Sequence, residues 1–100
     1  MIRQATPFKF SPYCSISLNA EKVFFKWLEK LPENVNLDII RLDVVSSKQV
    51  SNHIAHLFKI RHESPQVIWL SPESKVRWHG SHFQITSENL DEVLKTLSIQ

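Results

Sequence analysis

The segment Ser11-Pro12-Tyr13-Cys14-Ser15-Ile16-Ser17 holds the only cysteine among the 100 residues of the chain. It follows an extended apolar stretch and precedes an amphipathic one with the spacing of a helix. A thiol in the first turn of a helix lies beside backbone N–H groups without intrahelical partners, at the positive end of the helix dipole, so the thiolate is favoured. The hydroxyl of Ser17 lies on the same side of that turn and can donate a hydrogen bond to the sulfur of Cys14. The Cys-x-x-Ser pattern therefore indicates a nucleophilic cysteine that acts without a second one.

The composition of the chain limits the kinds of protein that it can be. With 100 residues, of which 42% are hydrophobic, the sequence predicts one domain over residues 1–100. A net charge of +2 without basic runs argues against nucleic-acid binding, and no stretch reaches the ~18 apolar residues that cross a membrane. An unpaired cysteine fits the reducing cytoplasm, which is the location we expect. The single glycine, Gly80, excludes a glycine-rich phosphate loop.

The elements that must position the cysteine follow from hydrophobic periodicity. It predicts strands at residues 6–10, 37–44, 66–70 and 76–79, and helices at about 14–30, 47–59 and 86–98. The second strand is placed at an edge of the sheet because Ile40, Leu42 and Val44 line one face while Arg41 and Asp43 occupy the other. The order strand, helix, strand, helix, strand, strand, helix predicts an α/β fold, a four-stranded mixed sheet with three flanking helices.

Each helix is predicted to bury one apolar stripe. The residues expected in these stripes are Ile16, Ala20, Val23, Phe24, Trp27, Leu28 and Leu31, then Val50, Ile54, Leu57 and Phe58, and finally Leu90, Val93, Leu94 and Leu97. Ser46 and Gln49 are expected to form a capping box for the second helix. The three tryptophans are expected in the core, with the alternative that Trp78, on an outer strand, caps a pocket.

Four segments carry a resemblance to a known family. They are a strand ending in Phe8-Lys9-Phe10-Ser11, the motif Cys14-Ser15-Ile16-Ser17, the segment from Arg61 to Val67 and the segment from Trp78 to Thr86. Together they resemble the small YtxJ-type monothiol bacilliredoxins of the thioredoxin superfamily, over nearly the whole chain. Relatives usually carry proline directly after the cysteine, where this chain has Ser15. The resemblance implies a thioredoxin-like fold in its short form, of order βαβαββα, beginning at the strand before the cysteine.

The resemblance also implies which residues form the site. In the thioredoxin-like arrangement, the turn at Ser64-Pro65 and the turn from His79 to His82 converge on Cys14, and Pro65 is cis. A cis proline would aim the backbone of Ser64 at the site, where it can pair with an extended substrate. The residues assigned to catalysis are Cys14 and Ser17, and those assigned to substrate binding are Lys9, Ser15, Ser64, Pro65, Trp78, Gly80, Ser81 and His82.

Several charged residues leave two interpretations open. Lys9 is either a positive charge for the thiolate or for an anionic thiol, or a solvated strand tip. Arg61 and His62 could serve the same anion or be exposed loop charges. His53 and His56, and separately His79 and His82 with Cys14, could ligate a metal, but the spacing of a specific zinc motif is absent and we predict no metal.

The function that the resemblance implies is thiol–disulfide exchange by a single cysteine. Cys14 would remove a low-molecular-weight thiol, bacillithiol, from S-thiolated client proteins, with bacillithiol as a co-substrate and no bound cofactor. One alternative is a non-catalytic thioredoxin-like binding module or redox sensor. The other is a metal carrier that uses Cys14 and the histidines.

Overall fold

The predicted elements occur in the predicted order in the computed structural model, which describes residues 4–33 and 35–98, and side chains up to residue 96. They are β1 (Gln4–Phe10), α1 (Ser15–Leu28), β2 (Leu37–Asp43), α2 (Lys48–Phe58), β3 (Gln66–Leu70), β4 (Val76–Ser81) and α3 (Ser87–Ser98). A short 3-10 helix that was not predicted, η1 (His82–Gln84), connects β4 to α3. In the described part of the chain, no helix has the length and apolar character needed to span a bilayer.

The four strands form one mixed sheet in the order β2-β1-β3-β4, which confirms the predicted sheet and its edge strand β2. β1 and β2 are parallel, whereas β3 is antiparallel to both β1 and β4. Gln66, at the start of β3, pairs with Lys9 near the end of β1 and with Ser81 at the end of β4. This register brings the segments that follow β1, precede β3 and follow β4 to the same edge of the sheet.

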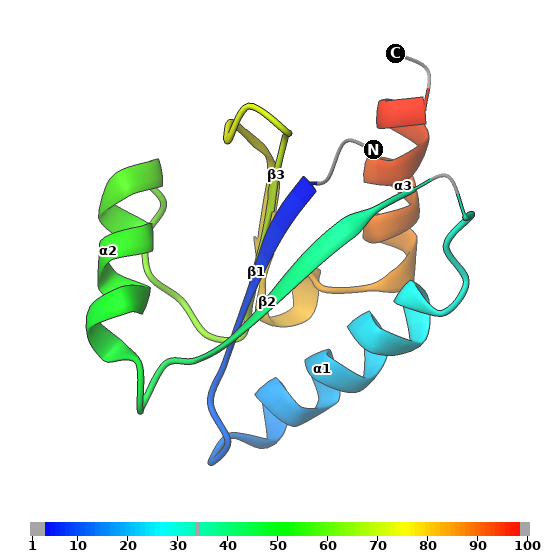
Figure 1. The fold of residues 1–100 in the computed structure, drawn as a ribbon. Helices are drawn as coiled ribbons and strands as arrows, with labels where there is room; N and C mark the ends of the chain where they lie inside the picture. The colour runs from blue at the N-terminus through cyan, green and yellow to red at the C-terminus, as the bar shows by residue number, and fades with distance from the viewer. Residues whose placement is uncertain (1–3, 34, 99–100) are drawn as a thin grey trace.

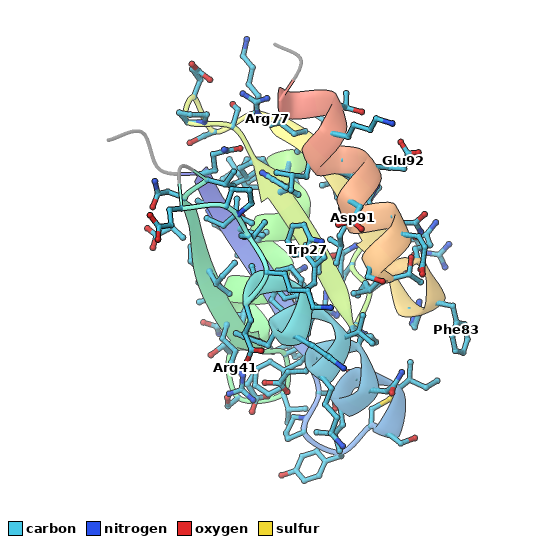
Figure 2. All side chains as sticks on the ribbon, turned by 90° about the vertical axis from the view of Figure 1, so that its right-hand side faces the viewer. Trp27, Arg41, Arg77, Phe83, Asp91 and Glu92 are labelled. Carbon is cyan, nitrogen blue, oxygen red and sulfur yellow. The ribbon has the colours of Figure 1, made fainter. Side chains whose placement is uncertain are left out.

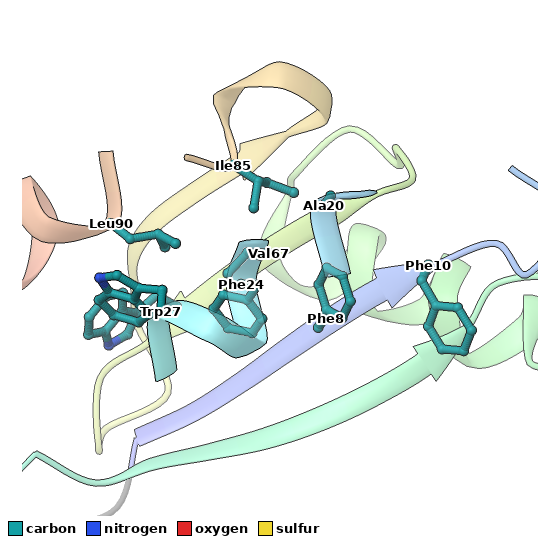
Figure 3. Packing of buried hydrophobic residues seen from close by; sticks show 9 residues of the cluster. Phe8, Phe10, Ala20, Phe24, Trp27, Val67, Ile85 and Leu90 are labelled. Carbon is teal, nitrogen blue, oxygen red and sulfur yellow. The ribbon is translucent and has the colours of Figure 1, made fainter. Parts of the chain in front are cut away.

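Helices cover the two faces of the sheet unequally, with α2 on one face and α1 and α3 on the other (Figure 1). The larger core lies between the sheet and α1 and α3 (Figure 3), and its buried residues are Phe8, Phe10, Ala20, Phe24, Trp27, Val67, Trp69, Ile85 and Leu90. A smaller cluster of Ile60, Ile68 and Leu70 packs with α2 on the opposite face. All five residues of β3 are buried, because this central strand is covered on both faces. Of the apolar stripe predicted for the last helix, the side chain of Leu97 lies outside those described.

Some apolar residues predicted to be buried are exposed. In α2, Val50 and Leu57 are 51% and 59% exposed, because this helix contacts the sheet through a narrow stripe and no neighbouring helix covers its flanks in the described chain (Figure 1). Ile40 in β2 is 47% exposed for a related reason, since an edge strand has one open side. Ile16 is 38% exposed at the start of α1, where it lines a groove.

The capping box predicted at Ser46 and Gln49 is wrong. Helix α2 begins at Lys48 with Ser47 as its N-cap, and the Ser47 side chain makes no capping hydrogen bond. The turn before the helix is instead fixed by Asp43, whose Oδ1 accepts hydrogen bonds from the backbone N–H groups of Val45 at 2.8 Å and Ser46 at 3.2 Å. A carboxylate that accepts from the N–H groups two and three residues later closes this turn locally.

Candidate active site

Cys14 is the N-cap residue of α1, one position before the first helical turn. Its backbone is extended, with φ −116° and ψ 122°, and its carbonyl accepts the first helical hydrogen bond, from Leu18 N–H at 3.1 Å. The buried Ser17 fixes this geometry, because its Oγ accepts a hydrogen bond from Ser11 N–H at 3.1 Å and so ties the preceding loop to the helix. The hydroxyl proton of Ser17 is then left to point toward the sulfur.

The surroundings of the sulfur favour the thiolate. The backbone N–H of Ser17 contributes most to lowering the pKa of Cys14 below its ordinary value, followed by the N–H of Ile16. Partial desolvation acts in the opposite direction, and the Ser17 hydroxyl adds a smaller lowering effect. Cys14 is neither fully buried nor fully exposed, so the sulfur can meet a substrate while it keeps these contacts. This is the arrangement of a reactive rather than a structural cysteine.

The loop before β3 lies at the same edge as Cys14. The Ser64–Pro65 peptide bond is cis, the geometry that the resemblance implies. The Pro65 carbonyl accepts a hydrogen bond from His82 N–H at 3.0 Å, so this loop is joined to the turn after β4. The Oγ of Ser64 is buried and has no hydrogen-bond partner among the described residues. The two predicted turns are therefore together, and the binding roles of Ser64 and Pro65 stay predictions.

A groove of about 500 Å³ runs from the first turn of α1 to η1 and the start of α3. It is lined by Ser15, Ile16, Asn19, Ala20, Val23, His82, Phe83, Ile85, Thr86, Ser87 and Glu88. Two of the predicted binding residues, Ser15 and His82, are among these. Phe83 was not predicted, and its ring is 81% exposed and projects away from the body of the protein (Figure 2). Its only signal in the sequence was a phenylalanine among the polar residues of a turn, where a large aromatic ring is expected to be exposed.

Lys9 does not have either of the roles expected for it. Its side chain is fully buried, because it alternates with Phe8 and Phe10 and lies on the opposite face of β1, toward α2. Its Nζ donates hydrogen bonds to the carbonyl of Ser51 at 3.0 Å and to Nδ1 of His62 at 3.2 Å. Burial lowers the pKa of Lys9. The solvated-tip interpretation is wrong, and the ammonium group joins α2 to the loop before β3 instead of facing the groove.

Trp78 takes the core position expected for the three tryptophans, and Gly80 has a packing role that was not predicted. Trp78 packs against the larger core and lines a separate groove with residues of α3, so it does not cap the groove beside Cys14. Its indole ring lies over Gly80, and a Cβ added there would be 2.4 Å from the nearest ring carbon. Only glycine leaves room for the ring at this position of β4.

The acidic residue Glu63 was missed as a site residue. Its Oε2 accepts a hydrogen bond from the Ser81 hydroxyl and lies 3.3 Å from Nδ1 of His82. The Ser81 hydroxyl contributes most to lowering the pKa of Glu63 below its ordinary value. Partial desolvation raises that pKa, and the charges of His82, Arg61 and His79 lower it. The hairpin register predicts this contact, since residues just before Gln66 lie beside those that follow Ser81.

The histidines considered as metal ligands do not gather into a site. Both His53 and His56 are exposed on α2, on the face of the sheet opposite α1. Across residues 4–33 and 35–98, no three histidine, cysteine, aspartate or glutamate side chains are grouped so that they could hold a metal ion.

Comparisons with known proteins agree with this geometry. The family model described as monothiol bacilliredoxin BrxC matches residues 2–90. The structure of a putative oxidoreductase with a thioredoxin fold is 26% identical, with a TM-score of 0.78 over 91% of this chain and 77% of that one. Thioredoxin-2 of the malaria parasite is 16% identical, with a TM-score of 0.69 over 94% of this chain and 82% of that one.

Fasciola hepatica thioredoxin is also similar, at 16% identity and a TM-score of 0.67 over 95% of this chain and 81% of that one. At this level of identity the two thioredoxins show the fold alone. The family match covers both Cys14 and the loop with Pro65. The chain therefore belongs to the monothiol bacilliredoxin family and is a thiol oxidoreductase of the thioredoxin fold.

Proposed function

We propose that this protein removes a low-molecular-weight thiol, bacillithiol, from protein mixed disulfides through Cys14. The observation that carries the proposal is the position of Cys14 at the N-cap of α1, where the N–H groups of Ser17 and Ile16 lower its pKa. A lowered pKa enlarges the fraction of thiolate near neutral pH, and the thiolate is the form that attacks a disulfide. A lone cysteine suits a reducing compartment, so we place the reaction in the cytoplasm.

The reaction has two exchange steps. The Cys14 thiolate attacks the bacillithiol sulfur of the mixed disulfide, a new S–S bond forms to Cys14, and the client sulfur leaves with the electron pair of the broken bond. The chain has no second cysteine to resolve this adduct. A second bacillithiol thiolate then attacks the adduct at the bacillithiol sulfur, which releases bacillithiol disulfide and the Cys14 thiolate. The client cysteine is reduced, and two bacillithiol molecules are oxidised to their disulfide.

The groove beside the thiol supports this assignment. It begins at Ser15, the residue directly after Cys14, and is large enough for a small molecule. We assign the bacillithiol portion of the mixed disulfide to this groove. We assign the client chain to the cis-proline loop, where the backbone of Ser64 can pair with an extended segment as an added strand does. Tyr13 and Phe83, which are 85% and 81% exposed, provide aromatic surface for such a client.

The experiment that tests this function measures the mass of the intact protein. A purified protein with one cysteine is loaded with bacillithiol as a mixed disulfide and incubated with the wild-type chain or with Cys14→Ser. The wild-type chain should gain the mass of one bacillithiol, lose it again when free bacillithiol is added, and release the client as a free thiol. Cys14→Ser should show no adduct.

Two results would contradict the proposal. If wild-type protein forms no adduct and the client stays thiolated, exchange through Cys14 is excluded. If Cys14→Ser binds the thiolated client as tightly as wild type does and the client is never released as a thiol, the chain is a binding module instead. A control with iodoacetamide near neutral pH should show that Cys14 is alkylated faster than free cysteine.

A further inference from the structure

Glu63 and His82 form a pair that the exchange chemistry described above does not use. They come from two different turns, and Glu63 Oε2 lies 3.3 Å from His82 Nδ1 while it also accepts the hydrogen bond of the Ser81 hydroxyl. The backbone N–H of His82 donates to the Pro65 carbonyl at 3.0 Å. The histidine is thus held through both its side chain and its backbone against the cis-proline loop.

The other side of the His82 ring is open to the groove. The side chain is 44% exposed and lines the groove with Ser15 and Ile16, which directly follow the nucleophile. The residue has a left-handed backbone with φ 51°, a region in which histidine, asparagine and aspartate are enriched among residues other than glycine. The imidazole of His82 is therefore accessible in the groove that borders the reactive thiol.

The contact with Glu63 determines which ring nitrogen is available. A carboxylate only accepts hydrogen bonds, so His82 Nδ1, which faces Glu63 Oε2, carries a proton. Nε2 is then the nitrogen that can gain or lose a proton toward the groove. The arrangement is that of an acid–base histidine whose tautomer and ring orientation are set by an acidic neighbour.

We propose, on the basis of the exchange reaction proposed above, that His82 is the acid–base group of the groove and that Glu63 is its positioning residue. When Cys14 takes over the small thiol, the client sulfur leaves as a thiolate and receives the Nε2 proton of the His82 imidazolium, which gives a neutral client thiol and a neutral histidine. The neutral Nε2 then takes the proton of the second small thiol, whose thiolate attacks the adduct. One turnover restores both the imidazolium and the Cys14 thiolate, so protons and electrons balance without another reactant.

The test compares two disulfides that differ in how much their leaving group needs a proton. One is a cysteine-containing peptide that carries bacillithiol as a mixed disulfide, and the other is the aromatic disulfide DTNB, whose departing thiolate is already stable at neutral pH. The variant is His82→Asn, because asparagine tolerates the left-handed backbone but does not titrate near neutral pH. The control is His53→Gln, a histidine exposed on α2 on the other face of the sheet.

We expect His82→Asn to slow single-turnover release of the peptide thiol by about tenfold and to flatten its pH dependence, because proton transfer to a poor leaving group is lost. The rate with DTNB should change by less than about twofold, since a thiolate of low pKa leaves without a proton. Glu63→Gln should slow peptide release less than His82→Asn does, because the histidine remains but is no longer held by a carboxylate. His53→Gln should match wild type with both disulfides.

Equal rates and pH profiles for wild type and His82→Asn with the peptide would overturn this inference. Equal slowing with both disulfides would also overturn it, since the residue would then act only by positioning Cys14. Failure of the wild-type chain to take bacillithiol from the peptide while it still reacts with DTNB would instead overturn the proposed function.

Discussion

His62 and Glu63 are adjacent in the chain but belong to two polar groups of opposite character. His62 Nδ1 contacts Lys9 and Ser51. Lys9 and Ser51 are buried and His62 is exposed, and we call these three residues the buried polar cluster after the first two. Glu63 contacts His82 at the edge of the groove, and we call these two residues the groove-side pair. One loop therefore sends one residue toward α2 on one face of the sheet and the next residue toward the thiol groove.

The hydrogen bonds of the buried polar cluster link β1, α2 and the loop before β3. The Lys9 ammonium only donates hydrogen bonds, so His62 Nδ1 accepts and the ring is neutral. The Ser51 Oγ lies 3.1 Å from the same nitrogen. Burial contributes most to lowering the pKa of His62, and the positive charge of Lys9 lowers it further, while Glu63 has a smaller opposing effect. Buried hydrogen bonds that join separate elements stabilise one arrangement of the chain.

Among the described residues, the contacts of the groove-side pair leave one ring nitrogen of His82 without a partner, in a side chain that is 44% exposed and lines the groove. Both histidines are exposed, so the difference teaches that the partners of a histidine separate its two roles in this fold: His62 contacts the buried Lys9 and Ser51, and His82 contacts a partly exposed carboxylate. Changes in the buried polar cluster should therefore alter the free energy of unfolding, whereas changes in the groove-side pair should alter rates and titrations.

Lys9→Ala should have the largest effect. It removes a fully buried side chain and leaves a cavity between β1 and α2, so we expect a loss of about 2–4 kcal/mol in the free energy of unfolding. Urea unfolding at neutral pH measures this loss. The folded fraction should still form the Cys14 adduct at the wild-type rate, because Lys9 lies on the face of the sheet opposite the groove.

The matched control is Lys9→Met, which keeps the volume of the side chain and removes its charge. We expect it to change the free energy of unfolding by less than about 1.5 kcal/mol, because the lost hydrogen bonds are offset by removal of a buried charge.

The charge of Lys9 should also affect how the free energy of unfolding depends on pH. Because the pKa of Lys9 is lowered in the folded state, the unfolded chain holds this proton more tightly, so stability should rise as the pH approaches 10.5 in wild type more than in Lys9→Met. A Lys9→Ala protein as stable as wild type would remove the distinction between the two polar groups.

Ser51→Ala should have a smaller effect on stability. It removes the hydroxyl that contacts His62 Nδ1 but keeps the backbone carbonyl that accepts from Lys9, so about one buried hydrogen bond, about 1 kcal/mol, is lost. Urea unfolding of Ser51→Ala is compared with that of Asn52→Ala, a change at an exposed neighbour in α2 that should stay within about 0.5 kcal/mol of wild type. If the two variants unfold at the same urea concentration, the hydroxyl of Ser51 contributes nothing to the buried polar cluster.

Most of the fold could be predicted because it depends on periodicity and strand order. The apolar stripe of α1 and the buried run in β3 gave elements of the right type, and the hairpin between β3 and β4 fixed which ends meet at the sheet edge. Exposure could not be predicted in the same way. A helical stripe shows which residues share a face, but not how much of that face a neighbour covers, and this is why Val50 and Leu57 were assigned to the core.

The candidate site could be predicted only in part, for two physical reasons. Cys14 and Ser17 are close in sequence, so their relation follows from the geometry of one helical turn. Lys9 was misassigned because buried lysines are rare and its two partners come from distant segments. Glu63 and His82 are far apart in the chain, and their contact depends on the register of β3 and β4, which the sequence does not specify to the residue.

Between about pH 5 and 6.5, the stability of the protein should depend on the titration of His62. Because the pKa of His62 is lowered in the folded state, the unfolded chain takes up this proton first, and stability should fall as the pH drops below 6.5. His62→Gln should lack this part of the pH dependence. Thermal unfolding between about pH 5 and 6.5 measures it, with His53→Gln as the control. Parallel curves for wild type and His62→Gln would mean that His62 titrates as it does in the unfolded chain.

Ser81→Ala should have the smallest effect on stability but a clear effect on titration. The Ser81 hydroxyl contributes most to lowering the pKa of Glu63, so its removal should raise that pKa toward the ordinary value of 4.5. A lowered carboxyl pKa stabilises the folded protein above that pKa, and this stability is lost as the pH falls through it. Wild type should have this contribution at neutral pH, and Ser81→Ala should lack it. NMR titration of the Glu63 carboxyl carbon measures the shift, and Ser87→Ala, a change at a serine that lines the groove, is the control. If the titration of Glu63 is unchanged in Ser81→Ala, the positive charges of His82 and its neighbours keep Glu63 ionised. The groove-side pair would then be stabilised by its charges and not by the Ser81 hydroxyl.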